Sequence, residues 1–417
     1  MTQKCDVLVV GGGPAGIAAA VAAARNGAGT ILLEQYGFLG GLATAGMVGT
    51  ICGLYHRTED SQPRFLCGGF AREWARNLAQ SSASEPVLMP AGLYVLPYNV
   101  WAFQILADRF CREMPGLELI LHATAVSLKV HQRRVEQLRV LSSGKEMTFQ
   151  PNCIIDCSGD ATIPYLAGCS VGESTSQAAG VLFTMAPVDG SLHTTEGRVS
   201  ALRQIAQGAA KGRLNPACGQ VCFVQTPPFA AHASLKLSLV DSSNDPYSGM
   251  TRLEVKAREL IDDLSRFLVS EVPAFKSSQL TRVAAQVGVR VGRRIKGRSV
   301  LSETDVLECK KFDDGVACGA WPIEEWDIQG RPRLTCLPVG RYYEIPLGCL
   351  VADELDNVFA AGRCISACEK ALCSARVIGT AMATGYAAGF AAAACAANRT
   401  LSIAVQQLRK EQVPGDV

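Results

Sequence analysis

The stretch Asp6-Val-Leu-Val-Val-Gly-Gly-Gly-Pro-Ala-Gly16 decides the fold of this chain, together with the alanine-rich run after it and Thr30-Ile-Leu-Leu-Glu34. It reads as an apolar strand, a Gly-x-Gly-x-x-Gly turn, a helix and a second apolar strand that ends in an acid. Such an order predicts a βαβ unit of a parallel sheet, located at the amino-terminal end of the chain.

Each glycine of this turn has a physical reason. Gly11 permits the tight turn, Gly13 lets the backbone approach a pyrophosphate, and Gly16 lets the helix pack close to the sheet. The helix amino terminus then faces the diphosphate with free N–H groups and a partial positive charge. Glu34 stands where an acid accepts a hydrogen bond from a ribose hydroxyl. The stretch therefore predicts a dinucleotide site.

Composition sets the class of protein. The 417 residues are 48% hydrophobic and 19% charged, with a formal net charge of +2. That length favours two domains, or one domain with a large insertion. Since no basic stretch dominates, neither nucleic acid nor an anionic membrane surface is an expected partner.

The chain has 17 dispersed cysteines and no Cys-x-x-Cys pair. No basic leader or cleavage site precedes the nucleotide fingerprint, so we expect a reducing, cytoplasmic location with free thiols. Residues 377–397 carry no charge and are rich in alanine and glycine. We interpret this segment as a buried helix rather than a membrane span.

Strand patterns typical of a nucleotide domain recur far apart in the chain. Ile154-Ile-Asp-Cys-Ser-Gly-Asp160 and Asn357-Val-Phe-Ala-Ala-Gly-Arg363 each lead an apolar strand into small residues. We predict an α/β protein with a Rossmann-like domain, discontinuous in sequence, and an inserted α+β substrate or cap domain. The predicted limits are 1–56, 98–175 and 338–417 for the first domain, and 57–97 and 176–337 for the second.

With these motifs the chain resembles the FAD-dependent oxidoreductase family of the glutathione-reductase-type fold. The resemblance also includes Phe38-Leu-Gly-Gly-Leu-Ala-Thr44, Val289–Gly297, Leu301–Val306, Tyr343-Glu-Ile-Pro346 and Ala361 through Ala388. It implies non-covalent FAD as the cofactor. Where relatives often carry Tyr-Pro-Ile followed by Asp-x-His, this chain has Trp321-Pro-Ile-Glu-Glu-Trp326, so no role of that histidine is carried over.

The resemblance also implies which residues hold each part of FAD. The first turn would face the pyrophosphate, and the acid after the second strand would face the ribose. A glycine-rich loop would run beside the ribityl chain and the flavin, and a later backbone position would touch adenine. The amino terminus of the last helix would face the pyrimidine end of the flavin. In chain order these residues are Gly11, Gly13, Pro14, Ala15, Gly16, Glu34, Gln35, Gly40, Gly41, Ala43, Thr44, Val126, Ser158, Gly159, Asp160, Gly362, Arg363, Arg376, Val377 and Thr380.

Four residues are candidates for catalysis. Cys52, after the predicted flavin loop, could form an adduct or exchange electrons with a disulfide, or be a small packed residue. Tyr55 and His56 follow it; His56 could be an acid/base or an exposed loop histidine. Arg294 belongs to a basic run, Arg290–Arg298, in which strand alternation would align Arg294, Lys296 and Arg298 to bind a carboxylate substrate or to face solvent.

Cys364, Cys368 and Cys373 gather near the predicted flavin edge. With Cys52 they could ligate an iron–sulfur cluster or zinc, form a redox disulfide, or simply pack. No metal is expected otherwise.

The expected function is an FAD-dependent oxidoreductase that moves a hydride or electron pair between a small substrate and a second acceptor. One alternative is an electron-transfer subunit with a cysteine-bound cluster or redox disulfide and a protein partner. Another is a non-catalytic flavin-binding protein. A nicotinamide dehydrogenase is less favoured, because only one complete fingerprint is present. A homo-oligomer is possible.

Overall fold

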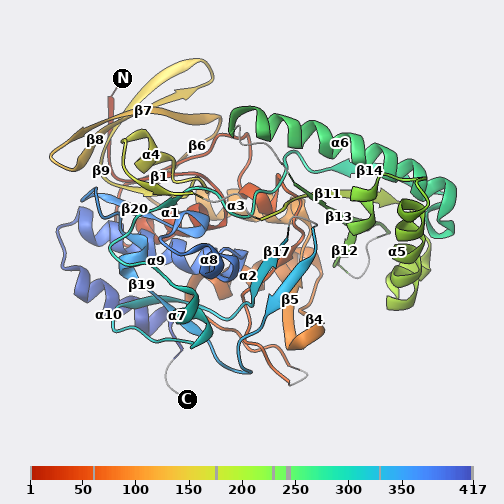
Figure 1. Ribbon diagram of the computed structural model, residues 1–417. Coiled ribbons are helices and arrows are strands. Elements are labelled where there is room, and N and C mark those ends of the chain that lie inside the picture. The colour runs from red at the N-terminus through yellow and green to blue at the C-terminus, as the bar shows by residue number, and fades with distance from the viewer. Residues whose placement is uncertain are drawn as a thin grey trace.

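A seven-stranded sheet organises the larger lobe of the molecule (Figure 1). The computed structural model describes residues 2–59, 62–173, 177–227, 231–240, 246–327 and 330–414. The strands lie in the order β6-β2-β1-β9-β8-β7, with β20 also paired to β9. Their bounds are β1 (Thr2–Val10), β2 (Thr30–Leu33), β6 (Leu117–Ile120), β7 (Ala123–His131), β8 (Arg134–Ser142), β9 (Lys145–Asp156) and β20 (Val358–Ala360).

The register of this sheet joins distant parts of the sequence. Strand β1 runs parallel to both β2 and β9, with Val10 opposite Leu33 and Asp156. Strand β20 adds to the other side of β9, with Ala360 also opposite Asp156. The carboxyl ends of β1, β9 and β20 therefore lie at one edge, which is where open α/β sheets present backbone to ligands.

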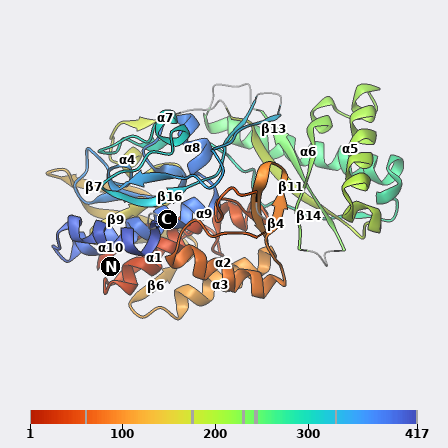
Figure 2. The ribbon, with the colours of Figure 1, turned by 90° about the horizontal axis from the view of Figure 1, so that it is seen from below.

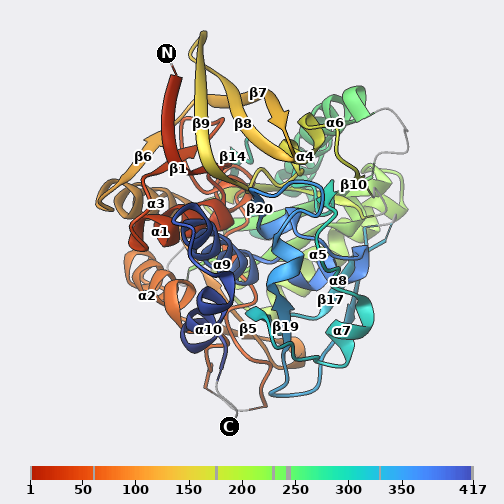
Figure 3. The same ribbon diagram turned by 90° about the vertical axis from the view of Figure 1, so that its left-hand side faces the viewer.

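Two alanine-rich helices, α1 (Pro14–Arg25) and α9 (Ile378–Ala396), pack against each other beside this sheet (Figure 3). Gly385 and Gly389 of α9 lie on Ala15 and Ala19 of α1. A Cβ built on either glycine would stand 2.1 Å from the facing carbonyl oxygen. The alanine and glycine content of both helices is thus explained by their close approach. Around them lie α2 (Gly69–Ser82), α3 (Val100–Arg112) and α10 (Leu401–Gln412).

Within the described ranges, α9 is the one helix long and apolar enough to cross a membrane by length and composition. Of its most apolar window, 89% is buried inside the protein. The expected buried helix is therefore what the structure contains at residues 378–396.

A second lobe is built on the antiparallel sheet β12-β13-β11-β14, with α5 and α6 packed against it (Figure 2). Leu235 and Leu237 of β13 enter its separate hydrophobic core. Lys236, between them, points to the opposite face of the strand. The elements are β11 (Ala179–Ala186), β12 (Cys222–Val224), β13 (Ala233–Leu239), β14 (Gln279–Val283), α5 (Thr195–Ala210) and α6 (Pro246–Glu271).

Short elements complete the molecule, and of these β17, β5 and β4 lie on the side of the larger lobe that faces the second lobe (Figure 1). Three small sheets are β3 (Thr50–Ile51) with β5 (Leu93–Pro97) and β4 (Val87–Met89), β16 (Gly315–Gly319) with β19 (Tyr343–Pro346), and β17 (Ile323–Trp326) with β18 (Pro332–Thr335). A fourth pairs β10 (Val171–Gly172) with β15 (Arg294–Ile295). Short helices are α4 (Thr162–Leu166), α7 (Glu303–Leu307) and α8 (Glu369–Ala375).

The predicted α/β class, with a Rossmann-like sheet and separate antiparallel sheets, is confirmed. The exact domain limits stay a prediction. Phe70 and Trp74 of α2 and Val316 of β16 share the core of α1 and α9, although they fall inside the limits predicted for the inserted domain. Among the described residues, the buried members of the second core lie between Ala179 and Val287, and partly buried Met47 packs against them.

Candidate functional site

The turn after β1 is shaped by backbone contacts that only glycine allows. Gly11 has φ +102°, and a Cβ on it would lie 2.5 Å from the carbonyl oxygen of Cys157. A Cβ on Gly16 would lie 1.8 Å from the carbonyl oxygen of Gly11. Both contacts are consistent with the predicted tight turn and close packing of the helix on the sheet.

A strip of bare backbone borders this turn. Gly40 donates to the carbonyl oxygen of Gly12 at 2.8 Å, which brings the second glycine-rich segment beside the first. Apart from chain neighbours, a Cβ on Gly13 would have only Gly41 Cα within 4 Å, at 3.9 Å. Thr44 Oγ1 donates to the Leu39 carbonyl at 2.8 Å and fixes the far end of the loop, where Ala43 is buried.

Pro14 occupies the first turn of α1, and Gly13 caps it with extended backbone. The first N–H groups of a helix have no acceptor within the helix, so those of Ala15 and Gly16 are available to an anion. Because Gly13 and Gly41 have no side chains, the diphosphate of a ligand can come close to these N–H groups.

Glu34 lies at the end of β2 and is only 4% exposed. Its carboxylate accepts hydrogen bonds from Gly12 N at 2.6 Å and from Tyr36 N at 2.9 Å. Burial raises the pKa of Glu34, and these backbone donors act against that rise. Glu34 therefore ties the glycine turn to the second strand, while the side chain of Gln35 is exposed. Carboxylate lone pairs remain for a ribose hydroxyl.

The segment after β9 is held by Asp156, which is fully buried. Asp156 accepts from the Ser158 hydroxyl at 2.6 Å and from Ile163 N at 2.7 Å. Gly159 N donates a hydrogen bond to Cys364 Sγ at 3.0 Å. Gly159 adopts φ +86° beneath Arg363, whose guanidinium pairs with Asp160 at 3.2 Å. The two later predicted segments are thus joined to each other.

Arg363 also donates to the Val289 carbonyl at 2.9 Å, so its guanidinium already holds two protein partners. Gly362, with φ +68°, donates to Thr384 Oγ1 at 3.1 Å, and a Cβ on it would lie 2.9 Å from Ala15 Cβ. Gly362 therefore touches the start of α1. Val126 is the extra residue of a bulge in β7 and is 40% exposed; its predicted contact with adenine stays a prediction.

The amino terminus of α9 meets the segment that follows the predicted flavin loop. Val377 caps this helix, and Gly379 N donates to the Cys52 carbonyl at 2.9 Å. Two buried polar atoms here, Thr380 Oγ1 and Arg376 Nε, have no hydrogen-bond partner among the described residues. Unsatisfied buried donors at a helix amino terminus fit a ligand that accepts hydrogen bonds.

The four candidate catalytic residues are not brought together. Burial raises the pKa of the Cys52 thiol to about 12, so at neutral pH this thiol is protonated. Tyr55 is buried among Phe65 and Tyr94 at ring distances of 4.8 and 6.2 Å, and burial raises its pKa. A catalytic role for either stays a prediction, and their packing favours structural roles.

Arg294 lies in the two-residue strand β15, opposite Gly172, and donates to the Gly292 carbonyl at 3.2 Å. It is buried, whereas Lys296 and Arg298 are exposed. The predicted alignment of these three side chains on one strand face is wrong, because the strand ends at Ile295.

His56 is buried, not exposed as the alternative interpretation had it. Its ring makes an edge contact with Tyr342 at 5.7 Å, and Nδ1 has no partner among the described residues. Burial, with smaller contributions from Arg64 and Lys311, lowers the pKa of His56 to about 4, and a backbone hydrogen bond partly opposes this shift. The ring is therefore neutral at pH 7.

We expect this burial to make the free energy of unfolding depend on pH. An unfolded histidine titrates at about 6.5, so between pH 6.5 and 4 the unfolded chain binds more protons than the folded one. Stability from this group is full above pH 6.5 and falls by about 1–2 kcal/mol by pH 5. Urea unfolding of wild type and His56→Gln at pH 7.5 and 5.0 measures it. The variant should lose less stability on acidification; equal losses would contradict the assignment.

The cysteines predicted as possible cluster ligands also lie in different surroundings. Cys364 faces Asp156 and Gly159, whereas Cys368 caps α8 by accepting from Ala371 N at 3.4 Å. In the part of the chain that the structure describes, no three His, Cys, Asp or Glu side chains form a group that could hold a metal ion. All described cysteines are free thiols. The structure gives no support to a cluster or a disulfide at this place.

A group of charged residues that the sequence did not single out as a site lies beside Cys52. We call Lys236, Arg290 and Arg376, with Glu324 and Trp326, the cationic cluster. Lys236 Nζ lies 3.7 Å and Arg290 Cζ 4.3 Å from the centre of the Trp326 ring. Arg376 donates to the Glu324 carbonyl at 3.1 Å. Two features of the sequence lie in this cluster: the basic run that contains Arg290, and the segment Trp321–Trp326, which differs from the pattern of the family. Neither feature pointed to Lys236.

The Glu324 carboxylate is fixed by two indoles. Trp321 Nε1 donates to one oxygen at 2.9 Å and Trp326 Nε1 to the other at 2.8 Å. Burial opposes ionisation of Glu324, but Arg376, Lys236 and the indole donors outweigh it and lower its pKa. Glu324 is therefore a permanent anion at neutral pH.

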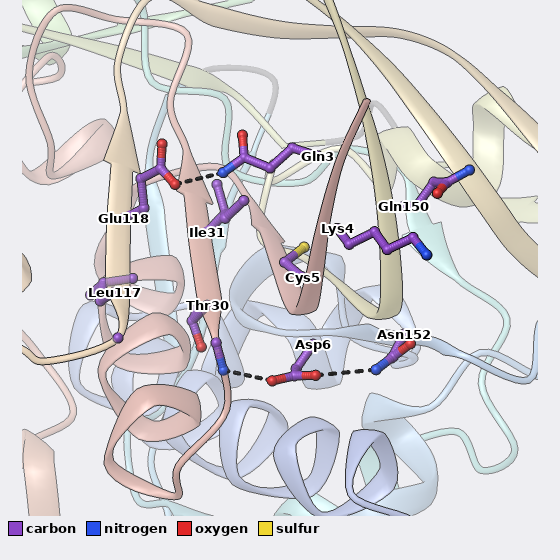
Figure 4. Close-up of a pocket in the computed structure, with 12 residues that line it drawn as sticks. Gln3, Lys4, Cys5, Asp6, Thr30, Ile31, Leu117, Glu118, Gln150 and Asn152 are labelled. Carbon is purple, nitrogen blue, oxygen red and sulfur yellow. Dashed lines mark hydrogen bonds between the residues drawn. The ribbon is translucent and has the colours of Figure 1, made fainter. Parts of the chain in front are cut away.

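A surface recess lies elsewhere, at the amino-terminal ends of β1, β2 and β6 (Figure 4). Asp6 there accepts from Gly29 N at 2.8 Å and from Asn152 at 3.2 Å, and Gln3 donates to Glu118 at 2.7 Å. These polar groups satisfy one another. The recess is at the sheet edge opposite to the glycine turn, so it takes no part in the site described above.

Comparison with solved structures shows a shared fold at low sequence identity. The protein BexE, studied for oxidation during BE-7585A biosynthesis, has a TM-score of 0.53 at 12% identity, over 97% of this chain and 66% of its own. The flavin-dependent brominase Bmp2 has 0.51 at 13%, over 98% and 83%. The anhydrotetracycline hydroxylase OxyS from Streptomyces rimosus has 0.50 at 12%, over 98% and 66%. No curated protein matches the chain.

These neighbours correct one expectation. Their fold is that of flavin-dependent hydroxylases and halogenases, rather than specifically the glutathione-reductase type that the motifs suggested. The family model "FAD dependent oxidoreductase" matches residues 6–412, which include every segment of the glycine-lined edge. The chain belongs to the FAD-dependent oxidoreductase family, and its cofactor is FAD.

Proposed function

We propose that this enzyme moves a hydride or an electron pair between a small substrate and a second acceptor through non-covalently bound FAD. One observation carries the proposal: four segments that contain glycine converge at one edge of the sheet. Gly40 bonds to Gly12, Gly362 touches Ala15, and Gly11 packs on Cys157. A long nucleotide cofactor needs such a continuous strip of accessible backbone.

The residues present fit FAD. Gly13, Ala15, Gly16 and Gly41 would hold the diphosphate, and Glu34 the ribose. Thr380 Oγ1 and Arg376 Nε, which lack partners among the described residues, would face the flavin. When bound, FAD supplies a ring that accepts and returns two electrons.

The protein's own groups set the electrostatics of that reaction. The amino terminus of α9 and the adjacent Arg376 place positive potential where negative charge would accumulate, an effect of about 0.3–2 kcal/mol for the helix end. The protonated thiol of Cys52 is a hydrogen-bond donor at most. His56 packs against Tyr342 and is neutral at pH 7, so it lacks the imidazolium proton that a general acid would donate.

The test is an absorption spectrum of the purified protein, followed by anaerobic photoreduction and reoxidation by a panel of acceptors. We expect stoichiometric FAD that denaturation releases, full reduction, and rapid reoxidation by at least one acceptor. A folded protein that stays colourless with excess FAD would sink the proposal. Stoichiometric iron would instead favour the electron-transfer alternative. A protein partner, a homo-oligomer and a cytoplasmic location stay predictions.

A further inference from the structure

The cationic cluster is assembled from four separate segments beside the predicted flavin position. Lys236 comes from β13 of the second lobe, Glu324 and Trp326 from β17, and Arg376 from the start of α9. Arg290 follows β14 and donates to the Ala178 carbonyl. Cys52, whose carbonyl binds the amino terminus of α9, lies close enough to Lys236 and Arg376 for their charges to act on its thiol. The cluster thus lies where the two lobes meet, a place that ligand sites favour.

The cluster carries more positive charge than the protein neutralises. Among the described residues, Lys236, Arg290 and Arg376 have no carboxylate within 4.0 Å. Glu324 acts electrostatically on all three, and its two oxygens accept hydrogen bonds from the two indoles. Burial, followed by the charge of neighbouring Arg376, lowers the pKa of Arg290 to about 9. Lys236, Arg290 and Arg376 are partly buried, and partly buried cations that lie close together are stabilised by an anion.

An apolar wall adjoins the cluster. Leu93 and Val95 of β5 pack with Trp321 and Val377, and partly buried Cys52 extends the same group. Trp321 belongs to both surroundings, because its ring packs in this wall while its Nε1 binds Glu324. A ligand between them would place an apolar body on one side and an anionic group on the other.

We propose that the cationic cluster binds the carboxylate of an organic acid, which is the substrate class of this enzyme. The identification as substrate rests on the proposed function above; the binding of the anion does not. The forked guanidinium groups of Arg290 and Arg376 can each offer two donors to one carboxylate, and Lys236 adds a point charge. The apolar wall selects an acid with an aromatic or aliphatic body over a small inorganic anion.

The experiment titrates the purified holoenzyme with benzoate and, in parallel, with its neutral analogue benzamide. Binding is followed by the change in bound flavin absorption and, independently, by tryptophan fluorescence, which also works on protein without FAD. Phenyl phosphate and inorganic phosphate test whether a phosphate is preferred to a carboxylate. We expect saturable binding of benzoate and at least tenfold weaker binding of benzamide and inorganic phosphate.

Variants assign the binding to these residues. Lys236→Met and Arg290→Gln should each raise the Kd of benzoate about 10- to 100-fold, the loss expected for one charge-assisted hydrogen bond. Lys236→Arg should retain binding. Lys256→Met, on α6 of the same lobe with a side chain 53% exposed, is the matched control and should change nothing.

Several results would overturn the proposal. They are no binding of benzoate, equal binding of benzamide, tighter binding of either phosphate, or an unchanged Kd in both Lys236→Met and Arg290→Gln. The Lys236 side chain, unlike that of Arg290, makes no hydrogen bond to the backbone of the described residues, so Lys236→Met remains informative if Arg290→Gln does not fold. A protein that binds benzoate by fluorescence but takes up no FAD would refute the proposed function while supporting the anion site.

Discussion

Gly13→Val is expected to give a folded protein that no longer binds FAD. Gly13 has φ −70° and extended ψ, a conformation that valine adopts without strain. A Cβ there would approach only Gly41 Cα, at 3.9 Å, so the fold itself has room for it. The added methyl groups would instead fill the bare strip between Gly13 and Gly41, where the diphosphate must come close to backbone N–H groups. Losing several charge-assisted hydrogen bonds should weaken binding by more than about 100-fold.

The measurement is FAD content after purification and the Kd for FAD added to the apoprotein, with circular dichroism as the check on folding. Gly190→Ala is the matched control, since a Cβ at Gly190 meets nothing within 4 Å. It should bind FAD like wild type. A Gly13→Val protein with normal FAD content would mean that the diphosphate does not lie on this strip.

Gly385→Val is expected to be among the most destabilising single changes in the chain, and Gly385→Val with Gly389→Val to abolish folding. Both glycines face the α1 backbone, and any Cβ would press on a carbonyl oxygen at 2.1 Å. Neither helix can shift easily, because α1 and α9 are buried along almost their whole length. Overpacking of this kind costs at least about 1–3 kcal/mol at one site. The double variant would then remove a large part of a total stability of about 5–15 kcal/mol.

Urea denaturation of the single variants and soluble yield of the double variant measure these effects. Ala206→Val, at an exposed position of helix α5, is the control for the lower helix propensity of valine and should cost under about 1 kcal/mol. Near-wild-type stability of Gly385→Val would show that α1 and α9 are not in close contact. Because Gly385 lies on Ala15, FAD affinity should fall in this variant even where it folds.

The predictions that held concern interactions local in sequence. The tight turn at Gly11 and the contact of Gly16 with the Gly11 carbonyl oxygen lie within one short segment, so the glycine spacing encodes them directly. The parallel strands were also readable, because a strand buried on both faces is a continuous apolar run. The small residues of 377–397 distinguished a helix packed against another helix from a membrane span.

Only the tertiary structure decided which charged residues lie together. The sequence pointed to Arg294 through strand alternation, but β15 ends after two residues and Arg290 reaches Trp326 instead. Lys236 is one polar residue in a strand, and no local sequence pattern marks it as a site residue. His56 is a loop residue, and its burial depends on the distant Tyr342, whose ring packs on it. Local patterns fix turns and strands because their constraints act within a few residues. The charge surrounding a side chain depends on segments that lie far apart in the sequence, which only the packing of the two lobes brings into contact.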